Sequence, residues 1–315
     1  MTAELEAPVS ERHTEAVPCN LCGGQDVREL YPARTDRSNG HYSATDIYAC
    51  TSNAYGLCGP IVQCQRCSLV FQSPVPPPSE IIHAYEEVVD ERYELERIGR
   101  VHTFGRDLAE LERYAPPGRV LDVGCHIGLF LEIAQQAGWE AWGVEPSNWA
   151  AERARARGLN VVHGALDHAD LPRESFDAVT MWDVIEHLND PLGALRHCRD
   201  LLKPNGVMAV CTMDVSALFP RLAGHRWPWY MQMHLIYFSK RTLAAMLQAA
   251  GYEVIGTAPH KRVVRADYLA SRLEGYFPPA AHLAQSALDS VGLGDKLISV
   301  DLGDLFLMFA RKRGN

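Results

Sequence analysis

The sequence predicts an α/β fold with a doubly wound, mostly parallel sheet, and three observations support this. An apolar run at 119–123 ends in a glycine turn, and a helical pattern follows it. A second apolar run ends on an acid, Glu145. Strand and helix patterns then alternate as far as residue 212, as expected of successive βαβ units.

The predicted elements follow one another with short connections. Strands are expected at 119–123, 139–144, 159–163, 176–181 and 206–212, and helices at 128–138, 147–157 and 191–202. Lys203-Pro-Asn-Gly206 is interpreted as a helix stop followed by a turn. A helix at 240–250 precedes strands at 252–257 and 303–310, and residues 262–299 between these strands are expected to form a helical insertion.

Four regions are expected along the chain. Residues 1–17 are polar and acidic without an apolar h-region, which is typical of a disordered leader and not of a signal peptide. Residues 18–73 hold closely spaced cysteines, and residues 74–117 combine a proline-rich linker with helical patterns. The α/β domain is expected to occupy 118–315.

Composition narrows the class of protein. Of the 315 residues, 47% are hydrophobic, which is enough for one sizeable core and a small accessory unit. The net charge of −9 argues against bulk nucleic-acid binding. No apolar run approaches the length of a membrane span. Nine cysteines without a secretory signal favour reduced thiols, metal ligation and a cytosolic location.

Two CxxC pairs predict a metal site. Cys19-x-x-Cys22 and Cys64-x-x-Cys67 each present two thiolates, and four thiolates form a closed tetrahedral zinc site with a structural or substrate-shaping role. The intervening segment is longer than the usual ribbon spacing of roughly 15–20 residues. It also contains Cys50 and Cys58, so a swapped ligand or a second partial site stays open.

The glycine turn distinguishes between two nucleoside ligands. A dinucleotide loop reads G-x-G-x-x-G, whereas Gly124 and Gly128 frame G-x-x-x-G. An acid such as Glu145 at the end of the next strand can accept both hydroxyls of a ribose. The loop resembles motif I of the class I S-adenosylmethionine (SAM) methyltransferases, in which no pyrophosphate has to be bound.

Further marks extend the resemblance over residues 18 to about 258. Segment 171–188 resembles motif IV of these enzymes, and 201–206 resembles their junction before strand five. The cysteine pairs, with the proline pair that follows and tyrosines 85 and 93, resemble the front end of sugar and natural-product methyltransferases. The resemblance implies a seven-stranded sheet with a small N-terminal zinc-ribbon-like unit.

The same resemblance implies the cofactor contacts. Glu145 is expected to hold the ribose hydroxyls, and the methionine end of SAM is expected to lie against Gly124, Cys125, His126 and Gly128. Leu166 and Asp167 are expected near the adenine edge, and Trp182 and Asp183 where the fourth strand ends. Two positions depart from the family pattern, because His126 replaces a common glycine and Ala165 replaces an adenine-binding acid.

Histidines are the expected proton acceptors. His234 lies in a segment, 234–239, that resembles the His-Leu-x-Tyr-Phe-Ser sequence of sugar C-methyltransferases, whose histidine is the base. Gln232 stands where that family often has a second histidine. His187 is the second candidate, and its alternative role is to pack a helix start. His225 is interpreted either as a substrate contact or as an exposed loop residue.

The leading hypothesis is therefore a SAM-dependent methyltransferase acting on oxygen or carbon of a sugar or natural-product intermediate. The alternatives are methylation of RNA or protein directed by the zinc unit, a non-catalytic SAM-binding scaffold, and a nicotinamide dehydrogenase, which the glycine spacing disfavours. Arg262, Arg265 and Arg272 are interpreted either as sites for an anionic substrate tail or, preferably, as a solvated helix face.

Overall fold

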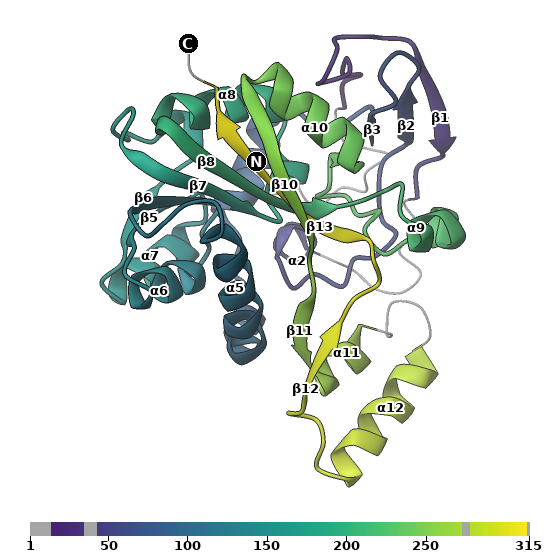
Figure 1. Ribbon diagram of the computed structural model, residues 1–315. Coiled ribbons are helices and arrows are strands. Elements are labelled where there is room, and N and C mark those ends of the chain that lie inside the picture. The colour runs from purple at the N-terminus through teal and green to yellow at the C-terminus, as the bar shows by residue number, and fades with distance from the viewer. Residues whose placement is uncertain (1–13, 35–42, 273–277, 314–315) are drawn as a thin grey trace.

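The computed structural model describes residues 14–34, 43–272 and 278–313, so most of the expected 1–17 leader lies outside the described residues. The central sheet has seven strands in the order β10-β13-β8-β7-β4-β5-β6, and Figure 1 shows helices packed around it. The strands are β4 (Arg119–Val123), β5 (Glu140–Glu145), β6 (Asn160–His163), β7 (Phe176–Trp182), β8 (Leu202–Met213), β10 (Tyr252–Pro259) and β13 (Leu305–Lys312).

Strands β4 to β8 pair in parallel, whereas β13 pairs antiparallel with both β8 and β10. The prediction of a mostly parallel, seven-stranded sheet is therefore confirmed.

Helices cover both faces of the sheet because alternate strand residues point to opposite sides. Val120 and Ala178 face a core built with α5 (Arg97–Leu111), α6 (Leu129–Gln136) and α7 (Asn148–Ala156). Their neighbours Leu121 and Val179 face a second core built with α3 (Pro78–Glu86), α8 (Pro191–Leu201) and α10 (Lys240–Ala249). Strands buried on both faces explain the continuous apolar runs in the sequence.

The N-terminal unit forms a second sheet, and one strand of this sheet comes from the α/β domain. Its order is β1-β2-β3-β9, made of β1 (Val27–Tyr31), β2 (Ile61–Cys64), β3 (Val70–Gln72) and β9 (Ile236–Tyr237). Strand β9 comes from the loop after β8, and Phe71 of β3 pairs with Ile236. The short helices α2 (Ala44–Tyr48) and α4 (Arg92–Leu95) complete this part of the chain.

The segment between β10 and β13 is not purely helical, which corrects the sequence-based interpretation. Strands β11 (Arg262–Arg265) and β12 (Leu297–Val300) pair antiparallel and enclose α11 (Ala266–Ser271) and α12 (Pro278–Ser290). Figure 1 shows this lobe projecting below the sheet. Arg262 and Arg265 therefore lie on a strand and not on a helix face, and Arg265 pairs with Asp267 and Asp295.

Strand β8 begins earlier than predicted, and residues 203–206 belong to it instead of forming a separate turn. The register with β7 explains the turn-like sequence, because Phe176 pairs with Leu202 while Ala178 pairs with Val207. The extra residues form a bulge in which Asn205 has a φ of 65°.

Short helices follow three strands at the carboxyl edge of the sheet. They are η2 (Leu166–His168), η3 (Ile185–His187), α9 (Leu218–Ala223) and η4 (Gly224–Arg226). Within the described parts of the chain, no helix is both long and apolar enough to cross a bilayer.

Two glycines of α5 provide a matched test of how this helix packs. A Cβ added at Gly99 would lie 2.4 Å from the carbonyl oxygen of Val263, whereas one added at Gly105 would meet nothing within 4 Å. We expect Gly99→Ala to lower the free energy of unfolding by roughly 1–3 kcal/mol, because α5 and β11 must separate. Gly105→Ala should raise it by roughly 0.5–1 kcal/mol. Urea unfolding measures both, and equal effects would contradict the packing.

Candidate active site

The glycine loop follows β4 in a conformation that requires glycine at two positions. Gly124 and Gly128 have φ values of 71° and 82°. A Cβ would lie 2.7 Å from Val184 Cγ2 at the first position and 2.2 Å from Leu159 Cδ1 at the second. A side chain at either position would collide with these neighbours, so the loop needs glycine to keep its tight path along the carboxyl edge of the sheet. This is the edge that binds ligands in such folds.

Glu145 ends β5 beside this loop. Its carboxylate accepts hydrogen bonds from the backbone N–H groups of His126 and Ser147, both at 2.8 Å. The side chain is buried, and burial raises the pKa of Glu145 to about 7 although both N–H groups act to lower it. The acid is thus held in place next to the glycine loop.

His126 lies between two aromatic rings. Its ring centroid is 3.8 Å from that of Tyr93 and 5.8 Å from that of Trp149. Burial, with the nearby charge of Arg100, lowers the pKa of His126 to about 3, so the ring is neutral. Both ring nitrogens are buried without a hydrogen-bond partner among the described residues. A polar ligand would meet that demand.

The positions of Cys125, Leu166 and Asp167 give less direct support for their expected cofactor contacts. The Cys125 thiol packs into the core, where a Cβ at Gly143 would approach its Sγ to 2.4 Å, so only its backbone can line the loop. Leu166 packs on the core, and Asp167 is exposed beside His168. The backbone N–H of Gly164 donates to the Glu145 carbonyl, which brings this segment next to the acid.

Asp183, just after β7, forms an ion pair with Arg262 at 2.6 Å. Burial opposes its ionisation, but Arg262 and His260 outweigh that effect and hold the pKa of Asp183 below its ordinary value. This pair joins the carboxyl edge of the sheet to the inserted lobe. Arg262 is therefore part of the site wall, and the preferred interpretation of a solvated face is wrong for this residue.

A polar cavity lies beside this ion pair, between α5, the end of β7 and β11. Its lining includes Glu96, Arg100, Asp107, Trp182, Asp183, His260, Arg262 and Tyr268. Asp107 accepts a hydrogen bond from His260 Nδ1 at 3.0 Å, with both side chains buried.

Four buried polar atoms of the lining have no partner among the described residues, namely Glu96 Oε2, Arg100 Nε, Asp107 Oδ2 and Trp182 Nε1. Such a concentration of unmet hydrogen-bonding groups favours a ligand with several polar groups.

The two predicted proton acceptors lie together near Asp183. The rings of His187 and His234 have centroids 4.7 Å apart. His234 Nδ1 lies 2.7 Å from the Trp229 carbonyl oxygen, and His187 Nδ1 lies 3.0 Å from that of Met233. A carbonyl only accepts, so each Nδ1 carries the proton and each Nε2 keeps its lone pair.

Burial determines the charge of both histidines. It lowers the pKa of His234 to about 3, with a further contribution from His187, while the Trp229 carbonyl and Asp183 act in the opposite direction. Burial likewise lowers the pKa of His187 to about 4. Both imidazoles are therefore neutral near pH 7, which is the form that accepts a proton.

Gln72 holds the loop that carries His234. Its Nε2 donates to the carbonyl oxygens of Met231 at 2.9 Å and His234 at 2.5 Å. Its Oε1 accepts from the backbone N–H of Gly59 at 2.6 Å. Gln72 is 3% exposed and belongs to the N-terminal sheet, so this sheet positions the histidine of the α/β domain.

The two CxxC pairs converge as predicted. Sγ atoms are 3.4 Å apart between Cys19 and Cys67 and 3.5 Å apart between Cys22 and Cys64, and all four lie within 4.8 Å of one another. Sulfurs bound to one zinc ion lie roughly 3.7 Å apart, which follows from Zn–S bonds of about 2.3 Å. The cluster therefore fits a closed four-thiolate site.

The knuckle geometry is the same in both pairs. The N–H of Gly23 donates to the Cys19 carbonyl, the N–H of Ser68 donates to the Cys64 carbonyl, and both donors have positive φ. Backbone N–H groups lower the pKa of Cys64 to about 7 against the effect of burial.

Cys50 and Cys58 lie outside the cluster, which removes the alternative of a swapped ligand. Cys58 is buried near Tyr230 and exchanges backbone hydrogen bonds with Arg34. The Cys50 thiol lies near Asp90 and His126.

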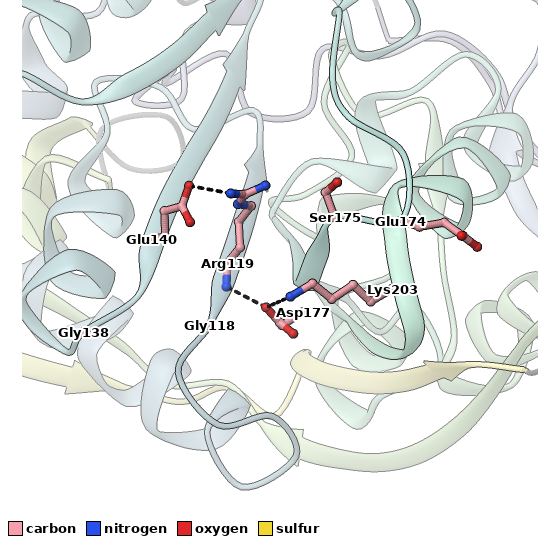
Figure 2. Close-up of a pocket in the computed structure, with 8 residues that line it drawn as sticks. All are labelled: Gly118, Arg119, Gly138, Glu140, Glu174, Ser175, Asp177 and Lys203. Carbon is pink, nitrogen blue, oxygen red and sulfur yellow. Dashed lines mark hydrogen bonds and ion pairs between the residues drawn. The ribbon is translucent and has the colours of Figure 1, made fainter.

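A further hollow lies at the opposite end of the sheet (Figure 2), between the starts of β4, β5 and β7. Its charged groups bind one another: Lys203 and the Arg119 N–H both contact the Asp177 carboxylate, and the Arg119 side chain pairs with Glu140. Ligands of parallel sheets bind at the carboxyl edge, so this hollow is not part of the site.

Sequence reasoning missed Gln72, Glu96, Asp107 and His260. None of them belongs to a motif, and each becomes notable only through a partner distant in the sequence. Gln72 donates hydrogen bonds to the backbone of residues 231–234. Asp107 pairs with His260, which lies 153 residues later in the sequence. The one signal in the sequence is an acid, Asp107, on the buried and otherwise mostly apolar face of an amphipathic helix.

Comparison with known proteins identifies the domain. A family model described as a methyltransferase domain matches residues 95–257, which is more than half of the chain. A ubiquinone biosynthesis O-methyltransferase of Haemophilus ducreyi is 36% identical over 107 residues, covering 30% of this chain and 45% of that protein. The enzyme of the same name from Rhodopseudomonas palustris is 38% identical over 104 residues, covering 30% of this chain and 40% of that protein.

The chain thus spans less than half the length of these curated relatives. Among solved structures, a SAM-dependent methyltransferase of Thermotoga maritima, described as a possible histamine N-methyltransferase, superposes with a TM-score of 0.48 at 23% identity. That superposition covers 71% of this chain and 94% of the other.

Proposed function

This chain belongs to the methyltransferase-domain family, and on that premise we propose that it transfers the methyl group of SAM to oxygen or carbon of a small molecule. The acceptor in this proposal is a sugar or natural-product intermediate. The observation that carries the proposal is the junction of the glycine loop with Glu145, since both features are needed to bind a nucleoside and both lie at the carboxyl edge of the sheet.

The residues at this edge fit the cofactor in two ways. The Glu145 carboxylate can accept both ribose hydroxyls, and the glycines with positive φ let the loop turn tightly beside that carboxylate. The unpartnered ring nitrogens of His126 offer polar contacts to the amino-acid end. The cofactor supplies an activated methyl group on a sulfonium, so the protein mainly has to align the acceptor and exclude water.

His234 is the proposed general base. Its Nδ1–H is held by the Trp229 carbonyl, which leaves Nε2 to take the proton of an acceptor hydroxyl or carbon acid. Asp183 lies close enough to favour the imidazolium that forms. The ring of His187 packs against that of His234 and helps to hold it in place. His187 Nδ1 also lies 2.9 Å from the Tyr85 hydroxyl.

The polar cavity near Asp183 is the proposed acceptor compartment. Its unmet carboxylate oxygens and N–H groups suit a molecule with several hydroxyls, as a sugar has. The curated relatives are named as O-methyltransferases, which favours oxygen as the methylated atom. An RNA acceptor is less favoured, because the net charge is −9.

The four-cysteine cluster is proposed to hold one structural Zn²⁺. A Cβ at Gly24 would come within 3.4 Å of both Cys22 Sγ and Cys64 Sγ, so the glycine keeps space free around the sulfurs. Four protein ligands leave no open position on the ion, which suits a structural role.

Binding of S-adenosylhomocysteine tests the cofactor site. If only the ionised Glu145 accepts the ribose hydroxyls, affinity should rise with pH up to about 7 and then level off, because the bound proton must first leave. At pH 6 affinity should be roughly tenfold below the plateau. Glu145→Gln should bind more weakly and show no such dependence. Calorimetric titration measures the affinity at each pH, with NAD as the control ligand. Tight NAD binding would contradict the proposal.

Replacement of His234 tests the base. We expect His234→Ala to keep its affinity for S-adenosylhomocysteine within about twofold while turnover falls by roughly 100-fold or more. The assay follows S-adenosylhomocysteine release with acceptors found by screening nucleotide sugars and pathway intermediates. His282→Ala, an exposed histidine on α12, is the matched control. Undiminished turnover in His234→Ala would assign the base role to His187 or to the substrate.

Metal analysis tests the cysteine cluster. Purified protein should contain about one zinc per chain, and Cys64→Ser should lose it together with much of its stability, since structural zinc binding is coupled to folding. Cys50→Ser, which changes a thiol outside the cluster, should retain the metal. A fully folded protein without zinc would contradict the proposal.

A further inference from the structure

A second group of metal-ligating side chains lies at the site of proton transfer. Glu186, His187 and His234 each offer one ligand atom, and these atoms all lie within 4.8 Å of one another. The first two residues belong to η3 after β7, whereas His234 precedes β9. The N–H of Leu235 donates to the Glu186 carbonyl at 2.8 Å, so the backbone joins the two segments.

The two histidines are oriented as metal ligands usually are. Each donates its Nδ1–H to a backbone carbonyl, at 2.7 Å for His234 and 3.0 Å for His187. This bond fixes the tautomer and the ring orientation, and it leaves the Nε2 lone pair for an ion. Two adjacent rings share this arrangement.

Glu186 completes the group with a buried carboxylate. The side chain is 1% exposed, and its Oε2 accepts a hydrogen bond from Thr212 Oγ1 at 2.9 Å. This bond orients the carboxylate in the way that outer partners orient metal-binding acids. Burial, together with the nearby charge of Asp183, raises the pKa of Glu186 to about 8, so an ion that binds here displaces a proton from this carboxyl group.

We propose that Glu186, His187 and His234 form a binding site for a divalent transition-metal ion such as Zn²⁺, separate from the four-cysteine cluster. Two imidazoles and one carboxylate suit Zn²⁺ or Co²⁺ better than Mg²⁺, which prefers oxygen ligands alone. Bonds of about 2.0–2.2 Å place the ligand atoms of one ion roughly 3–3.5 Å apart, so the three side chains have to draw closer around the ion than the 4.8 Å within which their ligand atoms lie.

The ion makes the site inactive, and this part of the inference rests on the proposed function. A metal on His234 Nε2 occupies the lone pair that would accept the proton of the acceptor. Glu145 and the glycine loop are not among the ligands, so cofactor binding is retained. Free zinc therefore acts as a reversible inhibitor that competes with proton transfer and not with the cofactor.

Cobalt titration tests the site directly. The protein is first loaded with one Zn²⁺ per chain at the cysteines, and Co²⁺ is then added. We expect one further ion to bind, with weak visible d–d absorption and without the intense thiolate bands that a cysteine site gives. Glu186→Gln and His187→Gln should each weaken this binding at least tenfold. His282→Ala is the control and should bind as the wild type does.

Glu186→Gln keeps the shape of the side chain and an oxygen for Thr212, so it should fold, and S-adenosylhomocysteine binding checks this. Absence of a second cobalt ion, or cobalt binding by both ligand variants as tight as by the wild type, would overturn the metal site. The turnover assay separates this from the proposed function. Metal should lower turnover, and a chelator should restore it, with unchanged affinity for S-adenosylhomocysteine; stimulation by the metal would refute the inhibitory role. Full turnover of metal-free His234→Ala would refute the base while leaving the cobalt result intact.

Discussion

The hydrogen bonds of the Gln72 carboxamide connect the two halves of this protein. They join the backbone of the N-terminal sheet at Gly59 to the carbonyls of Met231 and His234. All of these groups are buried, so loss of the carboxamide would leave several of them unpaired at a cost of about 1–3 kcal/mol each. The pairing of β3 with β9 also connects the two halves. Cys64 belongs both to the cysteine cluster and to β2 of this sheet, so the sheet links the cluster to the histidine loop.

Much of the fold could be predicted because its signals are local. The buried strands, the glycines with positive φ and the acid that ends β5 lie within a stretch of about one βαβ unit, and chain stereochemistry ties each of them to its role. The cysteine pairs could be predicted for the same reason, since CxxC spacing alone brings two thiolates to one side of a turn.

The features that were missed depend on tertiary contacts. No periodicity reveals that β9 completes the N-terminal sheet, because a two-residue strand has no pattern of its own. Asp107 and His260 read as ordinary helix and loop residues until the fold brings them to 3.0 Å. The insertion was interpreted as helical because α11 and α12 dominate its composition, while the strands beside them are four residues each.

The inserted lobe leaves and rejoins the sheet between two strands, β10 and β13, that are antiparallel neighbours. A segment at such a junction can be exchanged or resized without altering the register of the sheet. Yet this lobe contributes Arg262 to the cavity wall, and its Arg272 reaches the carbonyl of Ser52 in the N-terminal unit. If the cavity takes the acceptor as proposed, replacement of this one segment would change the acceptor while Glu145 and the glycine loop keep their geometry.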